Sequence, residues 1–262
     1  MSTSLSESQR RTYALEKTEN FRWVSNMLAK PSPKHLTSND LAPLDLQMQL
    51  SDIGQYTELA LGKLPSPEFI WKNLDRLLEP NFPLEGYNAL RGSELVASLH
   101  GSVGKLKGFI ARKSDKLIVA FSGTSNAIQS LNNFDARLCP HRAGGECKVH
   151  GGFWRLYDGI RTIAMDELEK ALQKGDVHEV ILTGHSLGAA TCYLFAMDLL
   201  DGQRAEITPL LSSESMILTL AVFGSPRAAN LALVQHWRQL YADRLSKGFI
   251  IREYSVKGYK DG

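Results

Sequence analysis

Hydrophobic residues recur along the first half of this chain with two different spacings, which predict two kinds of element. Over residues 44–61 and 69–78 the apolar positions lie mostly three or four residues apart, as in helices that pack one side against a core. Residues 94–121 instead form three apolar stretches separated by glycines and a Lys-Ser-Asp-Lys turn. This spacing predicts packing helices followed by antiparallel strands that lead into a central sheet.

The second half alternates short apolar runs with longer segments of helical spacing. The runs predict buried strands at residues 177–183, 216–223 and 249–256, and the segments predict helices at 153–174, 191–200 and 229–245. Strands that alternate with helices of this length are typical of a mainly parallel sheet covered on both faces. We therefore expect an α/β fold.

The first 40 residues differ from the rest because they are polar, and Pro31 and Pro33 interrupt any helix. The 262 residues are 43% hydrophobic and 22% charged, which suits a single globular domain. The composition predicts a polar N-terminal arm over residues 1–40 and one α/β domain over residues 41–262.

One strand-to-helix junction carries the strongest candidate for chemistry. The sequence GHSLG at residues 184–188 lies between a predicted strand and a predicted helix. A bare G-x-S-x-G is common, but this setting is the one that lifts a serine hydroxyl above the edge of a sheet. We predict that Ser186 is a nucleophile and that the backbone N–H of Leu187, at the start of the helix, faces a developing oxyanion.

A second small polar loop follows the predicted strand that ends at Phe121, and it reads SGTSN. Gly123 allows a close backbone approach, so Thr124 is our candidate for a second oxyanion donor. The alternative is an ordinary connection in which Ser125 or Asn126 caps a helix.

The segment after this loop has apolar residues on one side of a short predicted helix. These residues are Ile128, Leu131 and Phe134, which lie among glutamine and asparagine. Such a segment can act as a lid over a hydrophobic cleft. The alternative is a surface helix with one buried side.

The cysteines and the chain's first residues bear on metal binding and compartment. Cys139 and Cys147 flank a loop with two histidines whose spacing matches no common zinc pattern, so we expect no metal site. A disulfide between them would need export, yet the N-terminus lacks the apolar core of a signal peptide. We expect a cytoplasmic protein without a membrane span, or a secreted one if the true N-terminus lies upstream. Cys192 is expected in the core.

The charge balance limits the expected partners. A formal charge of +2 and a pI near 8.4 show no basic excess, so we expect no nucleic-acid partner. We also expect no cofactor.

Four tracts in a fixed order resemble the fungal-type lipase class 3 family. They are VAFSGTSN from Val119, KVHGGF from Lys148, GHSLGAA from Gly184 and VFGSPRAAN from Val222. The resemblance covers residues 45–262. It implies an α/β-hydrolase fold that cleaves acylglycerols or related esters.

Carried over by position, the resemblance implies a role for several residues. It makes Ser186 the nucleophile, Leu187 and Thr124 the oxyanion donors, and the segment after Asn126 the lid. The family usually has arginine where this chain has Ser122.

The acid and base of the expected triad follow the serine in this fold. Asp261 comes just after the last predicted strand and matches the start of the family's Asp-x-Val-Pro loop, so it is the candidate acid. Of the seven histidines only His236 follows Ser186, but it precedes Asp261 and lies in a predicted helix. His185 is expected to be structural. We therefore expect the sequence to be truncated before its catalytic histidine.

These observations predict a serine carboxylic-ester hydrolase that works through an acyl-enzyme, with acylglycerols as substrates at a lipid–water interface. The alternative is a non-catalytic protein with a lipid-binding or regulatory role. A peptidase or thioesterase on the same fold is a more distant third possibility.

Overall fold

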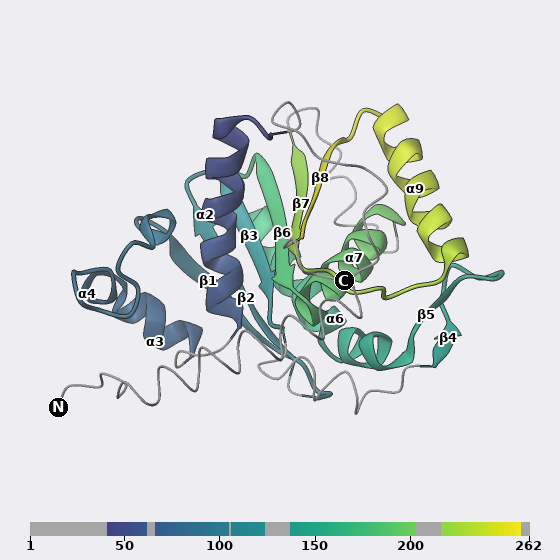
Figure 1. Ribbon diagram of the computed structural model, residues 1–262, viewed down its shortest axis with the longest axis horizontal. Helices are drawn as coiled ribbons and strands as arrows, with labels where there is room; N and C mark the ends of the chain where they lie inside the picture. Colours follow the sequence, from purple (N-terminus) through teal and green to yellow (C-terminus); the bar gives the residue numbers. More distant parts are fainter. Residues whose placement is uncertain (1–40, 62–65, 105, 124–136, 203–215, 258–262) are drawn as a thin grey trace. The chain divides into compact units, whose positions relative to one another are not determined.

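A six-stranded sheet organises the residues that the computed structural model describes, 41–61, 66–104, 106–123, 137–202 and 216–257 (Figure 1). Its strands, in spatial order, are β1 (Glu94–His100), β2 (Lys107–Lys113), β3 (Lys116–Phe121), β6 (Glu179–His185), β7 (Ile217–Phe223) and β8 (Ile250–Val256). The first three are antiparallel neighbours, and β3, β6, β7 and β8 run parallel. This confirms the predicted antiparallel entry into a mainly parallel sheet.

Helices cover both faces of the sheet (Figure 1). One face packs against α2 (Leu44–Ala60), with the short helices α3 (Pro67–Lys72) and α4 (Leu74–Leu77) beside it. The other face packs against α6 (Gly151–Gln173), α7 (Leu187–Leu200) and α9 (Leu231–Ser246). The α/β architecture expected from the alternating pattern is therefore confirmed.

The central strands are continuous apolar runs because both of their faces are buried. In β3, Leu117, Val119 and Phe121 pack on the side of α6 and α7, whereas Ile118 and Ala120 pack on the side of α2. Successive side chains of a strand point to opposite faces, so a strand between two helical layers has no solvent-facing position.

The helix expected over residues 69–78 is two helices. Asn73 interrupts it with φ −117° and ψ 16°, and its side-chain amide donates a hydrogen bond to the Phe69 carbonyl oxygen at 2.8 Å. Asparagine side chains compete in this way with the regular backbone pattern of a helix. The apolar spacing therefore continues through the break, while the backbone changes direction.

The loop with two cysteines contains a small hairpin that the sequence pattern did not predict. Its strands are β4 (Leu138–Pro140) and β5 (Lys148–His150), which pair antiparallel. Strands of three residues are too short for a recognisable alternation of apolar and polar residues.

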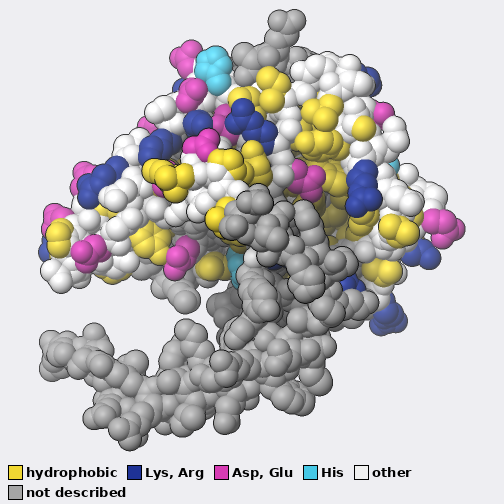
Figure 2. All heavy atoms as spheres, turned by 45° about the horizontal axis from the view of Figure 1, so that its top comes forward, with side chains coloured by type: hydrophobic (Ala, Val, Ile, Leu, Met, Phe, Trp, Pro, Cys, Tyr) yellow, Lys and Arg dark blue, Asp and Glu magenta, His cyan; other side chains and the backbone are white. Residues whose placement is uncertain are grey.

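The surface of the described residues carries mixed charge. On the face shown in Figure 2, basic and acidic side chains are interspersed, and several hydrophobic side chains lie together in the upper part of the view. This distribution agrees with the small formal charge of +2. Among the helices that the structure describes, none has both the length and the apolar character needed to cross a bilayer.

Candidate active site

The strand register brings the chemistry-bearing segments to one edge of the sheet. Phe121 of β3 lies opposite Gly184 of β6, which in turn lies opposite Val222 of β7, and Val222 lies opposite Ser255 of β8. The carboxyl ends of these parallel strands therefore meet at the same edge. Ligands of open α/β sheets bind outside this edge.

The turn at Ser186 is strained. Its φ is 54° and its ψ is −115°, and it separates the last residue of β6, His185, from the first residue of α7, Leu187. A non-glycine residue in such a conformation costs about 1–3 kcal/mol and persists only where its surroundings hold it. Here the Ser186 N–H donates to the Phe223 carbonyl oxygen at 3.0 Å, and its own carbonyl oxygen accepts from the Ala190 N–H at 3.2 Å.

Two glycines let the chain pass close to itself at this turn. A Cβ on Gly184 would lie 2.5 Å from the carbonyl carbon of Gly188. A Cβ on Gly188 would lie 2.3 Å from the carbonyl oxygen of Phe121 at the end of β3. Both contacts are with backbone, which cannot rotate out of the way, so the sequence pattern around Ser186 has a steric reason.

The loop after β3 packs directly against the same turn. A Cβ on Gly123 would lie 2.7 Å from the carbonyl oxygen of His185. Ser122 anchors the start of the loop, because its hydroxyl accepts from the Lys107 N–H at 3.0 Å and its own N–H donates to the Lys107 carbonyl oxygen at 2.8 Å. Ser122 thus ties this loop to the start of β2.

The predicted oxyanion donor, the Leu187 N–H, and the predicted nucleophile, the Ser186 hydroxyl, have no hydrogen-bond partner among the described residues. No side chain there caps α7, and neither the Leu187 N–H nor the Ser186 hydroxyl makes a hydrogen bond within the described part of the chain. The first N–H groups of a helix have no intrahelical acceptor, so they are available to an anion.

Several predicted site residues lie outside the described residues. Thr124, Asp261 and the lid residues Ile128, Leu131 and Phe134 all do. Thr124 is the next residue after Gly123, and Asp261 follows the end of β8 at Val256 by five positions along the chain. These assignments remain predictions.

Two of the histidines within the described residues belong to helix α9 and to the start of helix α6. His236 is a half-buried residue of α9, as expected from the sequence. His150 caps α6 by accepting from the Phe153 N–H at 3.4 Å. Neither is hydrogen-bonded to Ser186.

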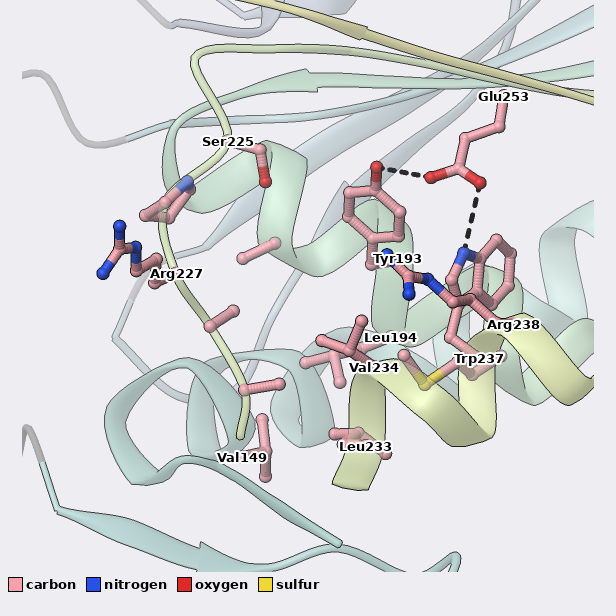
Figure 3. Close-up of a pocket in the computed structure, with 15 residues that line it drawn as sticks. Val149, Tyr193, Leu194, Ser225, Arg227, Leu233, Val234, Trp237, Arg238 and Glu253 are labelled. Carbon is pink, nitrogen blue, oxygen red and sulfur yellow. Dashed lines mark hydrogen bonds between the residues drawn. The ribbon is translucent and has the colours of Figure 1, made fainter. Parts of the chain in front are cut away.

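Two cavities border the carboxyl edge. One, of about 680 Å³, lies between α2 and the strand ends, where Phe223 and Val256 line it. Another, of about 440 Å³, lies between α7, α9, β8 and the segment that follows β7 (Figure 3). The two flank the sheet edge from opposite faces.

A buried carboxylate that sequence reasoning missed ties α6, α7 and the β4–β5 hairpin together. Asp198 is 2% exposed and accepts hydrogen bonds from the Tyr157 hydroxyl and, at 2.6 Å, from Nε of Arg161. Arg142 of the hairpin lies 3.3 Å from the same oxygen. Burial and then the Asp198 charge raise the pKa of Tyr157 well above its usual value. The sequence signal that could have indicated this cluster is that Asp198 is the one charged residue of the largely apolar helix α7.

The cysteines are free thiols. Cys139 and Cys147 lie half-buried in and beside the hairpin, and Cys192 is fully buried, as expected, which raises the pKa of its thiol. Within the described residues, no three His, Cys, Asp or Glu side chains are grouped so as to hold a metal ion.

Comparison with known families identifies the architecture. A profile of the family described as lipase (class 3) matches residues 118–252, more than half of the chain. The chain belongs to the class 3 lipase family. The matched span contains the Ser186 turn and the start of the loop after β3. Both lie at the carboxyl ends of the parallel strands.

Two relatives illustrate the range of the class 3 lipases. The chain is 28% identical over 237 residues to phospholipase A1-II 7 of Oryza sativa subsp. indica, covering 77% of this chain and 54% of that protein. It is 24% identical over 139 residues to a lipase of Rhizopus niveus, covering 52% of this chain and 34% of that protein. The chain spans about half the length, or less, of these relatives.

Solved structures of lipases share the fold. The lipase from Rhizopus microsporus var. chinensis superimposes with a TM-score of 0.66 at 22% identity, covering 86% of this chain and 71% of that one. A triacylglycerol lipase with a serine protease triad superimposes with a TM-score of 0.63 at 19% identity, covering 82% of this chain and 72% of that one. The class 3 lipase chain therefore has the α/β-hydrolase fold.

Proposed function

We propose that this chain hydrolyses the acyl esters of glycerolipids, with Ser186 as nucleophile. The observation that carries the proposal is the strained Ser186 turn, held between β6 and α7 by contacts with the ends of two neighbouring strands. Strain of this kind persists where a reactive group must be presented. Membership of the class 3 lipase family supports the same chemistry.

In the proposed reaction the Ser186 hydroxyl attacks the ester carbonyl carbon, and the alcohol leaves as an acyl-enzyme forms. The negative charge on the carbonyl oxygen is stabilised by the N–H of Leu187 and by Thr124. Water then releases the fatty acid. A base takes the Ser186 proton and donates it to the leaving alcohol, and it then takes a proton from the attacking water and returns it to Ser186. Asp261 orients this base, which we assign to none of the described histidines.

The substrate class rests on the names of the relatives. They include a phospholipase A1, a galactolipase and a mono- and diacylglycerol lipase, which act on different head groups. Acylglycerols are our first choice. The segment that contains Ile128, Leu131 and Phe134 is proposed as the lid that meets the lipid surface.

A fluorophosphonate probe tests the nucleophile, because it modifies activated serines irrespective of head group. We expect the probe to label Ser186, as located by mass spectrometry of the labelled peptide, and we expect Ser186→Ala to abolish labelling. Ser225→Ala is the matched control, since Ser225 follows the end of the adjacent strand, and it should keep full labelling.

A form of the protein that also carries the expected catalytic histidine should release fatty acid from emulsified diacylglycerol faster than from phosphatidylcholine or galactolipid vesicles. Labelling at another serine would contradict the role of Ser186. A protein that binds these lipids but neither reacts with the probe nor releases fatty acid would instead be the non-catalytic alternative.

A further inference from the structure

The 440 Å³ cavity beside α7 is built like a site for an amphiphile. Its size lies within the range of about 300–1,000 Å³ that is typical of small-molecule sites. One wall is a single side of α7, formed by Ala190, Tyr193, Leu194 and Met197, which lie three or four residues apart. The other lining residues come from α9, the segment after β7, Glu253 of β8 and Val149 of β5, so five separate segments line the cavity (Figure 3).

The interior of this cavity is apolar. Leu194 and Leu233 are nearly or fully buried, and Val234 is half-buried next to them. Figure 3 shows these three side chains grouped between α7 and α9. An alkyl chain in contact with these residues would be removed from water together with their apolar surface, which favours binding.

The cavity's acidic group is already fully engaged. Both carboxylate oxygens of Glu253 on β8 accept hydrogen bonds, one from the Tyr193 hydroxyl at 2.8 Å and one from the Trp237 indole N–H at 3.2 Å (Figure 3). Burial, and then the Glu253 charge, raise the pKa of Tyr193, so its hydroxyl stays protonated as the donor. These bonds hold two aromatic rings as fixed walls.

The two arginine side chains of the same cavity, unlike Glu253, have no hydrogen-bond partner among the described residues. Arg227 and Arg238 line it from opposite sides in Figure 3, and both are exposed. Neither guanidinium group makes a hydrogen bond or an ion pair with any residue that the structure describes. The lining therefore carries two positive charges and one negative charge, and this net charge of +1 favours an anion at the rim.

We propose that this cavity binds a single-chain anionic amphiphile, with the alkyl chain between α7 and α9 and the anionic head group at Arg227 and Arg238. A fatty-acid carboxylate and a lysophospholipid phosphate share this chemistry. The site goes beyond the hydrolysis proposed above and does not need it, because binding here involves neither Ser186 nor any bond breaking.

Binding is measured by calorimetry on the Ser186→Ala protein, which prevents turnover, with ligands kept below their critical micelle concentrations. The ligands are palmitate, palmitoyl lysophosphatidic acid and the uncharged 1-monopalmitoylglycerol. We expect saturable one-to-one binding of at least one anion and weaker binding of the uncharged ligand. The anion that binds more tightly identifies the source of the head group.

Two pairs of variants locate the ligand. Val234→Trp fills the cavity and should raise the Kd of the preferred anion at least tenfold, while Gln235→Trp, at an exposed neighbouring position outside the lining, should leave it unchanged. The double variant Arg227→Gln, Arg238→Gln should raise that Kd about fivefold and leave the uncharged ligand unaffected. The control double variant, Lys247→Gln with Arg252→Gln, removes the same charge from exposed residues outside the lining.

Three outcomes would overturn the proposal. They are the absence of saturable binding for both anions, equal affinity for the uncharged ligand, and an unchanged Kd in Val234→Trp when thermal melting shows that this variant is folded. None of these depends on probe labelling of Ser186, so the site can fail while the proposed hydrolysis stands, and the reverse also holds.

Discussion

The amino and carboxyl ends of the parallel strands differ in how their polar groups are paired. At the amino end, Lys116 of β3 lies opposite Glu179 of β6, and the Glu179 side chain is 4% exposed. One of its carboxylate oxygens lies 2.5 Å from Nζ of Lys116, and the other accepts from the Thr219 hydroxyl at 2.6 Å. A buried charge is tolerated at this end because it is paired and hydrogen-bonded.

At the carboxyl end the backbone is strained and donors are left open. Ser186 has a positive φ, and the N–H of Leu187 has no acceptor among the described residues. The chain is held there by close backbone contacts at Gly123, Gly184 and Gly188. The comparison indicates that the amino end contributes stability, whereas the carboxyl end holds a strained residue and a donor without an acceptor among the described residues, as the proposed function requires.

The largest effect should come from filling the closest backbone contact at the carboxyl end. Gly188→Ala puts a Cβ 2.3 Å from the Phe121 carbonyl oxygen, which must force the strand and helix apart. We expect a loss of about 3 kcal/mol or more in the free energy of unfolding, measured with urea, together with loss of probe labelling. Gly54→Ala in α2 is the control, since its Cβ would lie at an ordinary 3.7 Å from Phe223. Equal stability of the two variants would contradict the steric argument.

A smaller effect is expected at the amino end. Glu179→Ala leaves the Thr219 hydroxyl buried without its acceptor and the Lys116 ammonium without its partner. We expect a loss of about 2 kcal/mol in unfolding free energy, with probe labelling of the folded protein unchanged. Glu94→Ala, at the exposed first residue of β1, should change stability by less than about 0.5 kcal/mol. Loss of labelling in folded Glu179→Ala would show that the two ends are not separate in function.

The smallest effect isolates the backbone strain itself. Ser186→Gly and Ser186→Ala both remove the hydroxyl and should both fail to label, but glycine tolerates a φ of 54°. We expect Ser186→Gly to be more stable than Ser186→Ala by about 1 kcal/mol. At Ser225, which is not among the residues with positive φ, the order should reverse. The same order at both positions would argue against strain at Ser186.

The sequence by itself determined the longer elements and the position of one strained turn. Apolar runs such as 177–183 and 216–223 became β6 and β7, because a strand buried on both faces needs hydrophobic residues at every position. Residues 44–60 form α2, because apolar residues three or four positions apart lie on one side of a helix and pack against the sheet. The GHSLG pattern located the strained Ser186 turn, since only glycine at 184 and 188 permits the backbone contacts found there. These are local properties, which periodicity and residue size can report.

Tertiary structure alone decided what distant segments do together. The break at Asn73 and the hairpin of Leu138–Pro140 with Lys148–His150 arise from side-chain and backbone hydrogen bonds that leave no periodic pattern. The partners of Asp198 come from α6 and from the hairpin, and the lining of the amphiphile cavity comes from five segments. Such groupings depend on which faces pack against each other through space, and spacing along one segment carries no record of the segment that it will meet.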